Sequence, residues 1–206
     1  MILSRIFEIS GVRRLPVNPV EIAVSLGIKV VGYKAAAELF EMNVRDLYSR
    51  FPLGFSFKEG ENCCIALNEN ACGKQRRRFT AAHELAHCVL GHLNNANKAV
   101  FSSQQELDAE RFAADLLAPL VVLHKCGATS AEEIARICGI SYQAAKYRLK
   151  QLSERERLGF SADDDERRTA ELFREFAESC GRHCTAPVSR VRKQTDMAVS
   201  AYRQNQ

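Results

Sequence analysis

The chain has 206 residues, of which 46% are hydrophobic, and this is enough for one or two domains with a buried core. Its formal net charge of +4 is too small to indicate a nucleic-acid or membrane partner. Charged and polar residues interrupt the apolar start of the chain, and no later stretch approaches the roughly 18 apolar residues of a membrane span, so we expect neither signal peptide nor membrane helix. The eight cysteines form no CxxC pair, and we expect reduced thiols in a cytoplasmic protein.

In chain order, the first third of the sequence predicts helices beside a small sheet. Asn18 and the proline after it start a helix that ends at Gly27, and a strand follows over residues 28–31. A further helix is expected over residues 38–50. Alternating apolar residues on both sides of a turn then predict a hairpin over residues 55–67.

The stretch RRFTAAHELAHCVLGH, residues 77–92, predicts a helix that starts near Thr80 and carries an HExxH motif. His83 and His87 are four residues apart, so their side chains lie one turn apart on one face and can reach a single ion. Glu84 is offset by about 100° around the axis, which places it to hydrogen-bond a water rather than to bind the ion. Two imidazoles and a carboxylate in this pattern are typical of zinc hydrolases, in which the glutamate acts as general base.

A catalytic zinc needs a third protein ligand and one open position. His92 is five residues after His87, about 140° around an ideal helix, and is expected to face away. The next predicted helix, SQQELDAERFAADLLAP, carries Glu106, Asp108 and Glu110. Glu106 and Glu110 share one helix face, so one acid can bind the metal while another hydrogen-bonds a liganding histidine.

Residues 131–152 predict a helix, a tight turn and a second helix, the pattern of a helix-turn-helix unit. The second helix carries Lys146, Arg148 and Lys150, which could contact DNA. A DNA-binding transcription regulator with a structural or sensory metal site is therefore the alternative function. Against it, Glu132 and Glu133 reduce the local positive charge.

The segments IALNENACGKQRRRFTAAHELAH, ELDAERFAADLLAP and EEIARICGISYQAAKYRLKQL together resemble the ImmA/IrrE family of metallopeptidases over about residues 15–152. The resemblance implies that His83, His87 and Glu106 bind zinc and that Glu84 is the general base. Asp108 and Glu110 then remain candidates for positioning a ligand. It also implies a zinc-dependent endopeptidase that cleaves a helix-turn-helix repressor of the XRE type and so derepresses a mobile-element or stress operon.

The fold class that we expect is α+β. A small, mostly antiparallel sheet packs on the HExxH helix, and a helical C-terminal half with the helix-turn-helix-like unit follows. The expected divisions are a zinc metallopeptidase domain over residues 1–125, the helix-turn-helix-like unit over 126–154 packed on it, and a charged helical segment over 155–206. The cofactor expected is Zn²⁺, and the same ligands would also suit Mn²⁺ or Fe²⁺. The partner expected is a protein substrate, with no membrane and with DNA binding not favoured.

Overall fold

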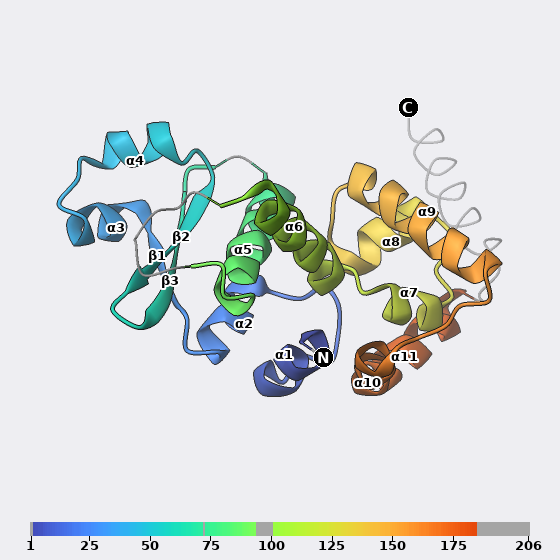
Figure 1. Cartoon of the computed structure of the whole chain (residues 1–206). Helices are drawn as coiled ribbons and strands as arrows, with labels where there is room; N and C mark the ends of the chain where they lie inside the picture. Colours follow the sequence, from blue (N-terminus) through green and yellow to red (C-terminus); the bar gives the residue numbers. More distant parts are fainter. Residues whose placement is uncertain (1, 72, 94–100, 185–206) are drawn as a thin grey trace, which may run out of the picture.

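The computed structural model describes residues 2–71, 73–93 and 101–184, with side chains described as far as residue 180. Its elements, shown in Figure 1, are α1 (Leu3–Ser10), α2 (Pro19–Ser25), β1 (Lys29–Gly32), α3 (Tyr33–Leu39), α4 (Val44–Arg50), β2 (Gly54–Glu59), β3 (Asn62–Leu67), α5 (Lys74–Val89), α6 (Ser103–Leu117), α7 (Leu120–Cys126), α8 (Ala131–Cys138), α9 (Tyr142–Arg157), α10 (Asp164–Leu172) and α11 (Arg174–Cys184). No helix in these ranges is long and apolar enough to cross a membrane.

The sheet has three strands in the order β1-β3-β2. β2 and β3 form the expected hairpin and pair antiparallel, with Phe55 opposite Ala66, whereas β1 joins β3 in parallel, with Val30 opposite Ile65. Helix α5 packs on β2 and β3 and also on α6, which lies along it (Figure 1). The structure therefore confirms the α+β class, with a mixed sheet beside the HExxH helix and a mostly helical second half.

Two predicted helix boundaries were wrong. Helix α5 begins at Lys74, six residues before the expected Thr80, because Thr80 serves as a buried packing residue instead of a cap. Its methyl group lies against β2 so closely that a Cβ added to Gly54 would be 2.8 Å from it. The helix expected over residues 38–50 is two helices, α3 and α4, because the chain turns at Glu41 with a φ of 51°.

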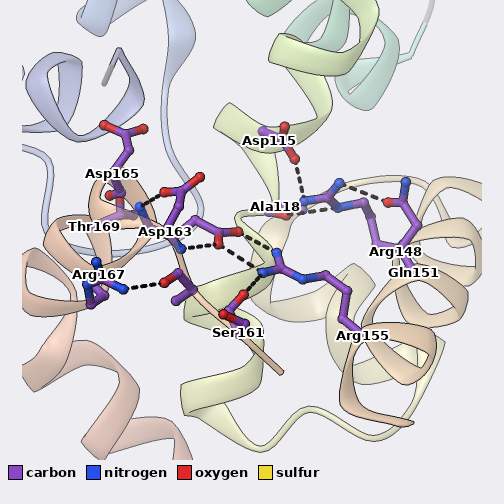
Figure 2. Close-up of polar contacts among 12 residues, drawn as sticks. Asp115, Ala118, Arg148, Gln151, Arg155, Ser161, Asp163, Asp165, Arg167 and Thr169 are labelled. Carbon is purple, nitrogen blue, oxygen red and sulfur yellow. Dashed lines mark hydrogen bonds and ion pairs between the residues drawn. The ribbon is translucent and has the colours of Figure 1, made fainter. Parts of the chain in front are cut away.

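Arg148 fastens α9 to the end of α6. Only 4% of this arginine is exposed. As Figure 2 shows, its Nε donates to the carbonyl oxygen of Ala118 at 2.9 Å and its Nη2 pairs with Asp115 at 2.8 Å. Gln151 accepts a further bond from it. Arg148, which would contact DNA in the alternative function, is therefore buried and bonded to α6.

Arg78 makes a second tie, between the start of α5 and the helix-turn-helix-like unit. Its guanidinium donates to the carbonyl oxygens of Cys138 at 3.1 Å and Val17 at 2.8 Å, and also to that of Gly139. Gly139 ends α8 with a φ of 61°, and an added Cβ there would lie 2.5 Å from the Arg78 guanidinium. The turn before α9 is therefore held directly on the HExxH helix.

Candidate metal centre

The two histidines of the motif and one acid of the following helix converge on one point. His83 and His87 extend from the same face of α5, and their Nε2 atoms are 3.1 Å apart. Glu106, in the first turn of α6, places its Oε2 3.2 Å from the Nε2 of His83 and 3.8 Å from that of His87. Among the described residues, these three form a group of possible metal ligands whose donor atoms all lie within 4.8 Å of one another.

These distances suit a zinc ion. Three ligands held about 2.1 Å from one ion at tetrahedral angles lie roughly 3.4 Å from each other, which the three separations approach. Two neutral imidazoles and one carboxylate are also the donor set of a catalytic zinc with one position left open. The side chain of Glu106 is 46% exposed, so the site is open to solvent on the side of Glu106.

Glu84 is buried beside this cluster, with 7% of its surface exposed. Burial raises the pKa of its carboxyl to about 7, and the negative charge of Glu106 adds to the rise, while the neighbouring Ser56 opposes it. The Ser56 hydroxyl, on β2, has no hydrogen-bond partner of ordinary geometry in the described part of the chain. A carboxyl that titrates near neutrality suits proton transfer in both directions.

His87 is held by two residues that sequence reasoning did not assign to the site. Its Nδ1 is 3.0 Å from the Nδ1 of His92, and the ring of Phe101 stacks on its imidazole with centroids 3.7 Å apart. Burial, with smaller effects from His83 and His92, lowers the pKa of His87 to about 3. His87 is therefore a neutral imidazole whose ring orientation is set from the side opposite Glu106.

The expectation that His92 faces away was wrong for a backbone reason. Helix α5 ends at Val89, and Gly91 adopts a φ of 70°, so the chain reverses instead of continuing the helix. The amide of His92 donates to the carbonyl oxygen of His87 at 3.0 Å, as in a Schellman turn. Glycine after the last helical residue was the signal that could have placed His92 beside His87.

The two other candidate acids on α6, Asp108 and Glu110, lie in different surroundings from Glu106. Asp108 accepts a hydrogen bond from Gln104 at 2.8 Å on the exposed side of the helix. Glu110, one turn beyond Glu106, borders a groove towards α9. The described contacts bring neither acid to a histidine. By contrast, the Nδ1 of His83 is buried without a hydrogen-bond partner among the described residues.

The fold and the site define a class of protein: a metallopeptidase domain of HExxH type with a glutamate from the next helix as third candidate ligand. The chain matches the family model for the IrrE N-terminal-like domain, peptidase family M78, over residues 41–150, and it belongs to this family of zinc metallopeptidases. The resemblance to ImmA/IrrE proteins is thereby confirmed. Neither a curated protein nor a solved structure shows a significant match to the chain.

Proposed function

We propose that this metallopeptidase cleaves a helix-turn-helix transcriptional repressor of the XRE type in the cytosol and so derepresses a mobile-element or stress operon. His83, His87 and Glu106 bind the zinc in this proposal, and Glu84 is the general base. The convergence of the three donor atoms beside a buried glutamate is the observation that carries the chemistry. The repressor as substrate is supported by the family resemblance described above.

The residues divide the reaction between them. When bound, zinc lowers the pKa of a water to about 7 and polarises the peptide carbonyl. Glu84 accepts the proton of the attacking water and returns it to the amine of the leaving chain. Because Glu84 follows His83 by one residue, its side chain is rotated by about 100° around the helix axis from that of His83. It is therefore beside the ligands without being one of them. The ring contacts of His92 and Phe101 keep His87 in its liganding orientation.

The first experiment separates metal binding from chemistry. Native protein and Glu84→Gln are purified, their zinc is measured, and each is incubated with the helix-turn-helix repressor encoded beside the protease gene. We expect one zinc per chain in both proteins, and cleavage slower by about 10²–10⁴-fold in Glu84→Gln, the usual contribution of a general base.

Matched acid variants on α6 test the third ligand. Glu106→Ala is expected to lose zinc, whereas Asp108→Ala keeps it, because Asp108 is bonded to Gln104. Absence of zinc from native protein, together with an intact repressor and retarded operator DNA, would overturn the peptidase proposal and favour the regulator. Retention of zinc by Glu106→Ala would reject Glu106 as a ligand, but it would not bear on the role proposed for Glu84 as general base.

A further inference from the structure

A groove of about 1170 Å³ lies between the α6 helix of the candidate metal centre and the second helix of the helix-turn-helix-like unit. Phe79 from α5, Leu107 and Glu110 from α6, and Gln143 and Tyr147 from α9 are among the residues that line it. Its volume exceeds the roughly 300–1,000 Å³ of small-molecule pockets, so it has room for a segment of polypeptide.

The groove starts beside the candidate metal ligands. Phe79 is one turn before His83 on α5, with ring centroids 6.3 Å apart, and Leu107 directly follows Glu106. Both side chains are 39% exposed although they are large and apolar. A chain that reached the metal centre would therefore continue along exposed apolar surface.

The charged groups of the groove argue against nucleic acid as its occupant. Five carboxylates and three guanidinium groups line it: Glu110, Asp115, Asp163, Asp165 and Glu166, and Arg111, Arg148 and Arg155. Arg148 and Arg155 are neutralised by ion pairs with Asp115 and Glu166 (Figure 2). This balance of charge repels a phosphate backbone, whereas apolar walls with isolated charges suit a polypeptide.

Helix α9 presents two different exposed faces. Tyr147, 64% exposed, lines the groove, and Ala144 lines it one turn earlier. Tyr142, 53% exposed, is absent from the lining and lies on another side of the same helix near Lys146. Tyr147 thus provides an exposed aromatic anchor of the kind that dominates peptide binding, and Tyr142 is a control on the same helix.

We propose that this groove binds the substrate polypeptide on one side of the cleaved bond, with an apolar side chain of the substrate between Leu107 and Tyr147. The proposal rests on the peptidase function proposed above and assigns to the helix-turn-helix-like unit a role in holding substrate. The face of α9 expected to read DNA would instead form one wall of the peptide groove.

The test needs no cleavage. Zinc-loaded Glu84→Gln protein, full length, is used to select from a phage library of random peptides, and the enriched peptides are titrated by fluorescence anisotropy. We expect enrichment of peptides with aromatic or large aliphatic residues. We expect Tyr147→Ala and Leu107→Ala to weaken binding about tenfold, and Tyr142→Ala to change it less than twofold.

Each other outcome overturns the groove as a peptide site: no enrichment, equal binding by Tyr147→Ala and the parent, or equal losses in Tyr147→Ala and Tyr142→Ala. The peptidase proposal is judged separately, because the selection uses the variant without its general base. If Tyr147-dependent peptides bind but native zinc protein cuts neither them nor the repressor, the groove stands and the proposed function fails.

Discussion

At the scale of single residues, the candidate metal centre combines local spacing with one contact from outside the motif. The i,i+4 spacing of His83 and His87 brings their Nε2 atoms within 3.1 Å, as helix geometry requires. The ring of His87 is fixed by His92, which the end of the helix returns to the site. Because Nε2 of His87 faces Glu106, its Nδ1 is expected to carry the ring proton and to donate a hydrogen bond to the Nδ1 of His92.

We expect His92→Ala to weaken zinc binding about 10- to 100-fold, the usual effect of removing the partner of a liganding histidine. His92→Asn should restore part of the affinity, since its amide oxygen can accept the same hydrogen bond. Competition with a chelator of known affinity measures both. Equal losses in His92→Ala and His92→Asn would show that His92 acts only through packing, and unchanged affinity would remove it from the site.

At the scale of elements, two arginines join helices that are distant in sequence. Arg78 joins α5 to the end of α8, and Arg148 joins α9 to the end of α6. Both donate to main-chain carbonyl groups at helix ends, where the oxygens lack partners within their own helix. The orientation of α9, and with it the groove beside α6, depends on these bonds.

Replacing Arg78 by Met is expected to destabilise the protein by about 1–3 kcal/mol, because the carbonyl oxygens of Cys138 and Val17 lose a charged donor. Urea unfolding monitored by circular dichroism measures the change. Arg76→Met is the control, since Arg76 is exposed two residues earlier on α5 and should shift stability by less than about 0.5 kcal/mol. Similar losses in the two variants would refute the tie.

At the scale of the whole molecule, the C-terminal helices bind both the helix-turn-helix-like unit and the beginning of the chain. Asp165 on α10 accepts a hydrogen bond from the hydroxyl of Ser4 at 2.6 Å and another from the amide of Leu3. Arg155 on α9 pairs with Glu166 on α10, at 2.9 Å for one of its bonds. Figure 1 shows α1 beside α10, so the described part of residues 155–206 closes against the first helix of the chain.

The Arg155–Glu166 pair predicts a pH-dependent contribution to stability. The hydrogen bond from Arg155 holds the pKa of Glu166 below its ordinary value. A lowered folded-state pKa stabilises the protein above the unfolded value, about 4.3, and this stabilisation is lost as the pH falls through the folded value. Glu166→Gln keeps a side-chain oxygen that can accept the hydrogen bond from the Asp163 amide but loses the charge.

We therefore expect Glu166→Gln to lower the melting temperature by about 2–4 °C at pH 7, for a partly buried pair worth about 1 kcal/mol, and this deficit to shrink at pH 3. Differential scanning calorimetry at both pH values measures this. Asp164→Asn, which removes the exposed pair with Arg167, should have little effect at either pH. A deficit in Glu166→Gln that persists unchanged at pH 3 would contradict the electrostatic explanation.

What the sequence determined by itself lies within single elements. Helix periodicity placed His83, His87 and Glu84 correctly on α5, and alternation with a turn predicted the β2–β3 hairpin, because these relations follow from the backbone geometry of one segment. The family resemblance selected Glu106 as the candidate ligand from the three acids in the first half of α6. The convergence of Glu106 with the two histidines, the return of His92, and the internal roles of Arg78 and Arg148 came only from the tertiary structure. Each of these depends on where the chain reverses and how two distant helices pack, and such contacts have no fixed spacing along the sequence.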